Sequence, residues 1–332
     1  MKLNILYTSD NAYASALCIS LTSLLKNNTQ AEEITVYVVQ DHWEEQYITK
    51  LQRQVAEYGE SRRLKLIDGE VWSKKLDEMG MLPYRGGQAP NLRLFFSNFI
   101  DPDVKRLLYL DCDTIICNDL APLFAMEMGS LPMAAVLDSL TTHYRQRIGF
   151  TPDDTYFNSG VLLFDVANWN NHKATEKLVA LLKSDKPKTF MNPDQDTLNI
   201  ALKNNIAVLH PRYNFQTTHK VYSNKVFFAN YGGIRYYTAE ELDDANANPT
   251  VLHAYRFLGQ FPWHENAVHP WRALFLEYAA KSQCADFTPK KNSGFAFRVE
   301  RVLYRLLPKS LFLPIFRLWQ VHHIKKHFKK HS

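Results

Sequence analysis

The stretch Leu107-Leu108-Tyr109-Leu110-Asp111-Cys112-Asp113 joins a short apolar run to two carboxylates. The run predicts a buried strand. Because alternate residues of a strand share a face, Asp111 and Asp113 are expected to point to the same side. Two carboxylates at the end of a strand form a hard oxygen site that suits Mg²⁺ or Mn²⁺. A loop with two solvated acids is the alternative, since Asp-x-Asp is a common pattern.

Strand and helix patterns alternate on either side of this stretch. The predicted strands are 3–8, 34–39, 64–67, 107–110, 133–137 and 161–164, and the predicted helices are 13–25, 43–58, 92–99, 174–183 and 194–203. Residues 211–260 are rich in Tyr, Asn, Phe and His and predict loops and short strands. The alternation predicts an α/β fold with a mostly parallel central sheet, in which ligands bind beyond the carboxyl ends of the strands.

Charge is distributed unevenly along the 332 residues. Residues 295–332 hold nine basic side chains and one acidic one, Glu300, whereas the rest of the chain holds 30 basic and 33 acidic. A slightly acidic body with a basic tail argues against a nucleic-acid-binding protein and favours one local contact with an anionic partner. Four scattered cysteines argue against a disulfide scaffold and a thiolate zinc site.

The tail itself predicts amphipathic helices. Phe295, Val299, Val302 and Leu306 fall on one helical stripe, and basic residues occupy another. Such a pattern is typical of a helix that lies in a membrane interface, although a helix packed on the body with a solvated basic end is the alternative. We therefore expect a globular domain at 1–275 and a basic, aromatic, membrane-associating tail at 276–332. With no leader pattern and no apolar run of ~20 residues, a cytoplasmic protein is expected.

Four further polar motifs follow or precede predicted strands and helices. They are Thr8-Ser9-Asp10-Asn11-Ala12-Tyr13, Tyr156-Phe157-Asn158-Ser159-Gly160-Val161, Asn192-Pro193-Asp194-Gln195-Asp196 and Leu252-His253 with Pro262-Trp263. None contains the Gly-rich loop of a P-loop or dinucleotide site. Each is compatible with a purely structural role; Asp10, for example, suits the N-cap of the following helix.

Taken in order, these motifs resemble glycosyltransferase family 8, the group of glycogenin and the bacterial lipopolysaccharide galactosyl- and glucosyltransferases. The resemblance covers roughly residues 3–265. It implies a Rossmann-like GT-A fold, a UDP-sugar donor, a divalent cation (usually Mn²⁺, with Mg²⁺ as an alternative) and retention of configuration at the anomeric carbon.

The resemblance also implies roles for individual residues. The metal ligands would be Asp111, Asp113 and His253, and the uridine contacts Thr8, Asp10 and Tyr13. Arg93 would reach the diphosphate or donor sugar, and the sugar would be held by Asp138, Asn158, Asp194 and Gln195. Cys112 is expected as a small buried spacer within the donor site, and Gly259 as the glycine of the segment that closes over the phosphates.

One departure concerns that closing segment. The family usually has Lys-Pro-Trp there, whereas this chain has Phe261-Pro262-Trp263 after a longer run. Arg256 is the candidate substitute for the missing cation, because a guanidinium pairs well with phosphate.

The implied function is transfer of galactose or glucose from a UDP-sugar to a cell-envelope glycan, such as a lipopolysaccharide core or lipid-linked oligosaccharide, at the inner membrane face. Since Gln195 is a poor nucleophile, we expect same-face attack, with Gln195 stabilising charge on the ring and Asp194 or Asp196 as the alternative nucleophile. A glycoprotein acceptor, a nucleotide-sugar hydrolase or nucleotidyltransferase, and a non-catalytic UDP-sugar-binding membrane-associated protein remain alternatives.

Overall fold

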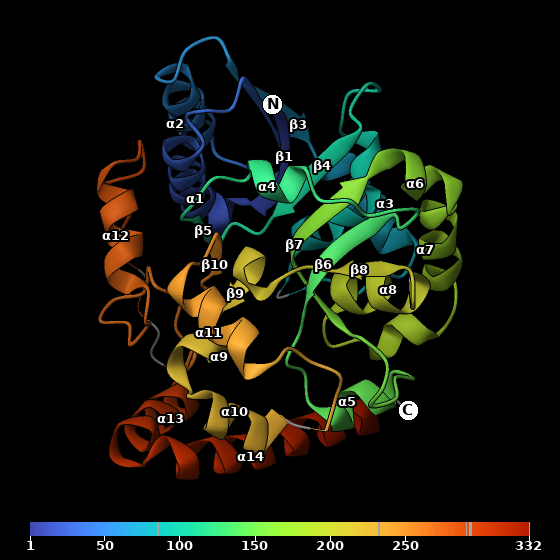
Figure 1. Ribbon diagram of the computed structural model, residues 1–332, viewed down its shortest axis with the longest axis vertical. Coiled ribbons are helices and arrows are strands. Elements are labelled where there is room, and N and C mark those ends of the chain that lie inside the picture. The colour runs from blue at the N-terminus through green and yellow to red at the C-terminus, as the bar shows by residue number, and fades with distance from the viewer. Residues whose placement is uncertain (85, 232, 290, 292–293, 332) are drawn as a thin grey trace.

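A seven-stranded sheet forms the centre of the computed structural model, which describes residues 1–84, 86–231, 233–289, 291 and 294–331 (Figure 1). Its order is β3-β2-β1-β4-β7-β6-β8. The strands are β1 (Lys2–Asp10), β2 (Glu33–Asp41), β3 (Arg62–Asp68), β4 (Arg106–Leu110), β6 (Met133–Leu137), β7 (Phe157–Asp165) and β8 (Ile206–Val208). β7 runs antiparallel to β4 and β6, and the other pairings are parallel. The predicted mostly parallel α/β architecture is confirmed.

Helices cover both faces of this sheet (Figure 1). One face carries α1 (Ala14–Asn27) and α2 (Glu45–Ala56), and the other carries α3 (Glu70–Glu78), η2 (Ala89–Asn98), α6 (Val166–Asn171), α7 (Ala174–Leu182) and α8 (Pro193–Ala201). α8 begins at Pro193, as the Asn-Pro start predicts. The segment predicted as a helix at 92–99 is instead a 3₁₀ helix interrupted at Phe95.

A second, three-stranded sheet lies beside the carboxyl ends of the first. Its order is β5 (Thr114–Ile116), β10 (Val251–His253) and β9 (Phe215–Gln216). β10 runs antiparallel to β5, which pairs His253 with Thr114. Since β5 follows β4 after a three-residue turn, this pairing brings residue 253 next to residues 111–113.

The expectation of loops and short strands over 211–260 is wrong for much of that segment. It holds η4 (Pro211–Asn214), α9 (Thr217–Val221), α10 (Asn224–Tyr231) and α11 (Ala239–Ala247) besides the two short strands. Phe227 and Tyr231 are buried, so packing overrides the weak helix propensity of this aromatic stretch. The capping box of Thr238 and Glu241 at the start of α11 is a readable helix sign that the composition obscured.

The remaining short elements connect these parts. They are η1 (Asn11–Tyr13), α4 (Ala121–Phe124), α5 (Thr142–Arg147), η3 (Lys186–Thr189) and α12 (Arg272–Ala280). α12 packs against α1, far along the chain, as Figure 1 shows.

The C-terminal segment forms two helices, α13 (Phe295–Leu306) and α14 (Lys309–His331), which lie along one side of the body beneath α10 (Figure 1). Phe312 and Leu313 are buried in a cluster with Tyr222 and Phe227. The outer surfaces of α13 and α14 expose large apolar residues, namely Phe295, Val299, Val302, Leu306, Leu311, Ile315, Leu318 and Trp319. The tail therefore both packs on the body and presents an apolar surface. Among the described residues, no helix combines the length and apolarity needed to cross a membrane.

Candidate active site

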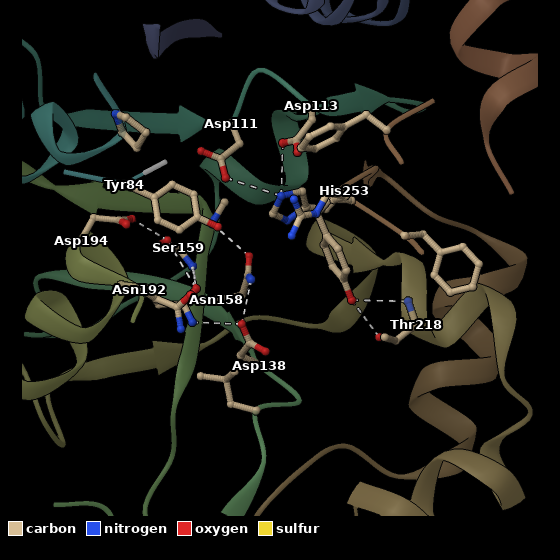
Figure 2. Close-up of a pocket in the computed structure, with 18 of the residues that line it drawn as sticks. Tyr84, Asp111, Asp113, Asp138, Asn158, Ser159, Asn192, Asp194, Thr218 and His253 are labelled. Atoms are coloured by element: carbon tan, nitrogen blue, oxygen red, sulfur yellow. Dashed lines mark hydrogen bonds and ion pairs between the residues drawn. The ribbon is translucent and has the colours of Figure 1, made fainter. Parts of the chain in front are cut away.

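A cavity of about 380 Å³ lies beyond the carboxyl ends of β1, β4 and β6. The side chains that line it come from both sheets and from segments far apart in the sequence (Figure 2). The predicted site residues among them are Thr8, Asp10, Tyr13, Arg93, Asp111, Cys112, Asp113, Asp138, Asn158, Asp194, Gln195, His253 and Arg256. The structure thus brings nearly all of the candidate residues to one place.

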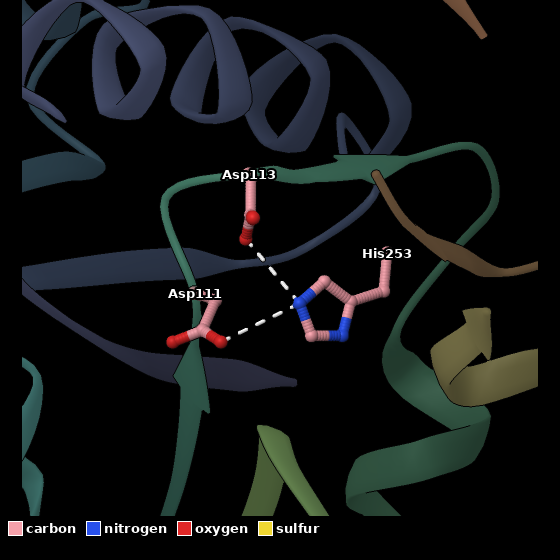
Figure 3. A group of neighbouring side chains, drawn as sticks. All are labelled: Asp111, Asp113 and His253. Carbon is pink, nitrogen blue, oxygen red and sulfur yellow. Dashed lines mark ion pairs between the residues drawn. The ribbon is translucent and has the colours of Figure 1, made fainter. Parts of the chain in front are cut away.

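Asp111, Asp113 and His253 form the one cluster of metal-ligand type found among the described residues. His253 Nε2 lies 3.5 Å from Asp111 Oδ2 and 3.3 Å from Asp113 Oδ1 (Figure 3). The expectation that strand alternation brings the two acids to one side is wrong, because β4 ends at Leu110 and residues 111–113 form a turn. The turn, held by a bond from Thr114 Oγ1 to the Asp111 carbonyl (2.7 Å), aims both carboxylates at His253.

The imidazole of His253 is held by Asn214. Its Nδ1 lies 3.0 Å from Asn214 Oδ1, which can only accept, so Nδ1 carries the proton. In the neutral ring, Nε2 is then left with its lone pair facing the two carboxylates. This is the arrangement of a metal-binding histidine, whose second nitrogen donates to a fixed partner.

The hydrogen bonds continue from Asn214 to the opposite side of the cavity. Asn214 Nδ2 donates to Asn158 Oδ1 (2.8 Å), which also accepts from the Gly160 amide (3.0 Å). Asn158 Nδ2 donates to Asp138 Oδ2 at 2.8 Å (Figure 2). Gln195 Nε2 donates to the same oxygen at 3.1 Å. Because a backbone N–H can only donate, the Gly160 amide fixes the orientation of the Asn158 and Asn214 side chains, and the Ser159 amide fixes that of Gln195. We call the chain His253–Asn214–Asn158–Asp138–Gln195 the amide relay.

Arg93 connects the metal-type cluster to Asp194 on α8. The residue is 3% exposed, and its Nη2 lies 2.8 Å from Asp111 Oδ1 while Nε lies 3.4 Å from Asp194 Oδ2. Nη1 donates to the Ser159 carbonyl at 2.6 Å. The guanidinium, with its single positive charge, therefore pairs with two carboxylates as well as lining the cavity.

The two acids of the Asp194-Gln195-Asp196 motif have different surroundings. Asp194 lines the cavity and accepts from Ser159 Oγ at 2.8 Å. Asp196 is fully buried, lies outside the cavity lining and accepts from the hydroxyls of Tyr144 and Tyr156. Burial raises the pKa of Asp196 to about 7. The expectation that Asp196 could serve as a nucleophile is wrong, because its carboxylate faces the core.

The first strand supplies the other end of the cavity. Asp10 caps η1 by accepting from the Tyr13 amide at 3.2 Å, as the local sequence predicts, and it also lines the cavity. Phe261 stacks on Trp263 at 4.4 Å and meets Tyr13 edge to face at 5.8 Å. Phe261, at the position where the family that the sequence resembles usually has Lys, thus extends the aromatic wall of the cavity.

Cys112 is buried as the expected spacer, with Sγ 3.5 Å from the Thr8 carbonyl. Gly259 is absent from the residues that line the cavity. It has φ +75°, and a Cβ there would lie 2.3 Å from the Phe297 ring. The glycine instead allows α13 to approach the 255–261 segment, a role that the sequence did not indicate.

Several residues in or next to the cavity were not indicated by the sequence. Asn214 carries no local motif, and it is found only through the pairing of β9 with β10. Gly160 lay in a quoted motif without a role; a Cβ there would lie 2.1 Å from His253 Cε1 and 2.9 Å from Asp111 Oδ2. Glu300 and Gln320 come from the tail, for which the sequence predicts only a membrane-associating role.

Opposing influences act on the charges of the cluster. Burial raises the pKa of Asp111, and Asp113 adds to the rise, while Arg93 and His253 oppose it. Burial would lower the pKa of His253, but the carboxylates of Asp113 and Asp111 outweigh it and the pKa is raised. Two carboxylates this close to one another favour a positive partner, which is what a divalent cation supplies.

Comparison with known proteins gives consistent results. A family model described as Glycosyl transferase family 8 matches residues 4–267. General stress protein A of Bacillus subtilis is 26% identical over 278 residues, covering 83% of this chain and 92% of that protein. A lipopolysaccharide 1,2-glucosyltransferase of Escherichia coli is 28% identical over 295 residues, covering 84% and 82%. The structure of galactosyltransferase LgtC, solved with donor and acceptor sugar analogues, superposes with a TM-score of 0.69 at 22% identity, covering 90% of this chain and 99% of that one, so the two share the GT-A fold.

Proposed function

Because the chain belongs to glycosyl transferase family 8, we propose that it is a retaining enzyme that moves galactose or glucose from a UDP-sugar to a cell-envelope glycan. The relatives that act on lipopolysaccharide favour a lipopolysaccharide core or lipid-linked oligosaccharide as the acceptor. A glycoprotein acceptor is the alternative within the same reaction class.

The observation that carries this proposal is the cluster of Asp111, Asp113 and His253, with Nε2 of the histidine presented by Asn214. Two carboxylate oxygens and one imidazole nitrogen suit Mn²⁺ or Mg²⁺, which keeps further positions for phosphate oxygens and water. When bound there, the cation would stabilise negative charge on the departing UDP.

The donor would lie along the cavity from β1 to the amide relay. Thr8, Asp10 and Tyr13 would contact uridine, and Arg256 would face the diphosphate in place of the family lysine. The sugar would then reach Asp138, Asn158 and Gln195, which offer fixed amide and carboxylate groups to its hydroxyls. In this scheme the ion pairs with Arg93 hold the side chains of Asp111 and Asp194 in place.

Retention would follow from same-face attack. Gln195 is clamped, with Oε1 accepting from the Ser159 amide (3.0 Å) and Nε2 donating to Asp138 and Tyr156. Its carbonyl oxygen would face the positive charge that develops on the ring as the bond to UDP breaks, and the acceptor proton would pass to the leaving phosphate. Asp194 would be the nucleophile of a two-step route, but its pairing with Arg93 and Ser159 disfavours attack on carbon.

The apolar surface of α13 and α14 suits a peripheral site on the cytoplasmic face of a membrane. Leu306 and Leu318 are 75% and 73% exposed, and nine basic residues accompany them in 295–332. Apolar and basic residues together favour attachment to an anionic lipid surface. A lipid-linked acceptor would be met there.

The test is UDP release from a panel of UDP-sugars, with and without Mn²⁺, for the wild type, Asp113→Asn and the exposed control Asp153→Asn. We expect Mn²⁺-dependent release from UDP-galactose or UDP-glucose, lowered about a hundredfold or more by Asp113→Asn and unchanged by Asp153→Asn. The anomer formed, read by NMR, reports retention.

A non-catalytic UDP-sugar-binding protein is the second candidate, favoured only by Phe261 at the usual lysine position. This second candidate predicts that UDP binding is detected by thermal shift, but that no UDP is released from any UDP-sugar. Release by the wild type would exclude it.

A further inference from the structure

The C-terminal helices form a wall of the cavity. Glu300 of α13 and Leu313, Phe316 and Gln320 of α14 line it, together with Tyr222 and Tyr231 of the body. This wall is anchored, because Leu313 is 1% exposed and Tyr304 packs edge to face on Phe312 at 5.2 Å. The far end of α14 is also fixed, through His327 and the Thr189 carbonyl at 3.0 Å.

Two side chains of this wall, Glu300 and Gln320, bring hydrogen-bond acceptors to the cavity. Glu300 is the single acid of residues 295–332, and it is half-buried at the cavity rather than turned to solvent like most of its basic neighbours. Gln320 Oε1 is buried and has no hydrogen-bond partner among the described residues. A buried carbonyl oxygen left without a donor is unfavourable, so a ligand hydroxyl that donated to it would be favoured.

The aromatic and aliphatic surface between these groups narrows the class of ligand. Phe316, Tyr222 and Tyr231 give apolar faces, and Glu300 gives a charge that repels phosphate. A saccharide has C–H faces that pack on rings and hydroxyls that donate to carboxylate and amide oxygens. The diphosphate of a donor nucleotide would be disfavoured beside Glu300 and would be held instead where a divalent cation bound to Asp111 and Asp113 offsets their negative charge.

We propose that Glu300 and Gln320 form the acceptor subsite, in which a saccharide of the acceptor donates hydroxyl hydrogen bonds to both side chains. The subsite rests on the proposed transferase function and adds the tail to the residues that select the acceptor. A site built to receive hydroxyls rejects molecules that lack them, so this wall would govern acceptor specificity.

The test compares Glu300→Gln, Gln320→Met and the control Arg305→Gln, which lies on α13 but outside the cavity lining and is exposed. UDP release is measured with the octyl β-glycosides of galactose, glucose and N-acetylglucosamine as acceptors. We expect the KM for the glycoside to rise about tenfold in Glu300→Gln and Gln320→Met, a rise that the KM for the UDP-sugar does not follow. Arg305→Gln keeps both values.

An unchanged glycoside KM in both variants would overturn the proposal while leaving the transferase function intact. If no glycoside accelerates UDP release by the wild type, saturation-transfer NMR is used to compare binding of the same three glycosides to the wild type and to Glu300→Gln. Binding that is lost in Glu300→Gln supports the subsite, and equal binding, or none to the wild type, overturns it. Absence of release from any UDP-sugar would instead contradict the proposed function.

Discussion

Charged side chains are buried and paired around the turn between β4 and β5, whereas most of those on the C-terminal helices are exposed to solvent. Arg93 and His253 are buried and paired with Asp111, Asp113 or Asp194. Most basic residues of the tail are solvated, and large apolar side chains stand exposed between them. In the turn, burial and ion pairing fix the positions of the side chains. In the C-terminal helices, exposed apolar and basic side chains remain able to contact a partner. Substitutions should therefore change chemistry in one region and attachment in the other.

The largest effect is expected for Gly160→Ala. A Cβ would lie 2.1 Å from His253 Cε1, far inside contact distance, so the imidazole must move away from Asp111 and Asp113. Mn²⁺ affinity, measured by calorimetry, should fall about a hundredfold and Mn²⁺-dependent UDP release with it. Gly87→Ala is the matched control, because its Cβ would meet only Asp10 Oδ2 at an ordinary 3.5 Å. Normal Mn²⁺ binding by Gly160→Ala would break the contrast between the two regions.

A somewhat smaller effect is expected for Asn214→Ala. Loss of the bond from His253 Nδ1 frees the imidazole to rotate and to change tautomer, which should weaken Mn²⁺ binding about 10- to 100-fold. Asn246→Ala, an exposed position on α11, should bind Mn²⁺ as the wild type does. Equal Mn²⁺ affinities of the two variants would show that the amide relay does not fix the His253 imidazole for metal binding.

The tail should respond in binding rather than in chemistry. Replacing Leu306 and Leu318 by Ser removes two exposed apolar side chains, each worth about 1.5–3 kcal/mol when buried, so sedimentation with vesicles of anionic phospholipid should weaken at least tenfold. UDP release with a soluble glycoside should stay unchanged. Val208→Ser, exposed on β8, serves as the control. Vesicle binding that survives the double substitution would exclude attachment through this surface.

The smallest effect concerns pH and stability. Burial raises the pKa of Asp196 to about 7, above its value in the unfolded chain, so the folded state binds more protons between pH 4 and 7. The free energy of unfolding should then fall as pH rises through this range, with a slope from this group of up to about 1.4 kcal/mol per pH unit. Urea unfolding of Asp196→Asn at pH 5 and pH 7 should lack this part of the slope. An equal slope in the variant would show that Asp196 is ionised in the fold at no cost.

The two regions also differed in how far they could be predicted. The sheet strands at 34–39, 107–110 and 133–137 carry dense apolar runs, and the structure has strands at each of them. Asp111, Asp113 and His253 were assigned from motif order, and the structure brings them together although the turn, not a strand, aligns the acids.

What escaped prediction depends on pairing between distant segments. Asn214 reaches His253 only because β9 lies beside β10, and no spacing in the sequence reports that register. Similarly, amphipathic periodicity located α13 but did not indicate that Glu300 turns inward to the cavity. Local patterns specify helices and strands, whereas the side chain that meets a given partner is decided by tertiary packing.

The amide relay has a thermodynamic consequence. It joins His253, where the proposed cation would bind, to Gln195, where the proposed donor sugar would lie, through hydrogen bonds whose directions are fixed by the backbone amides of Gly160 and Ser159. Ordering one end therefore reduces the entropy that remains to be lost at the other. Cation and sugar nucleotide should bind with positive cooperativity, and each must raise the affinity of the other by the same factor, since coupling free energy is reciprocal.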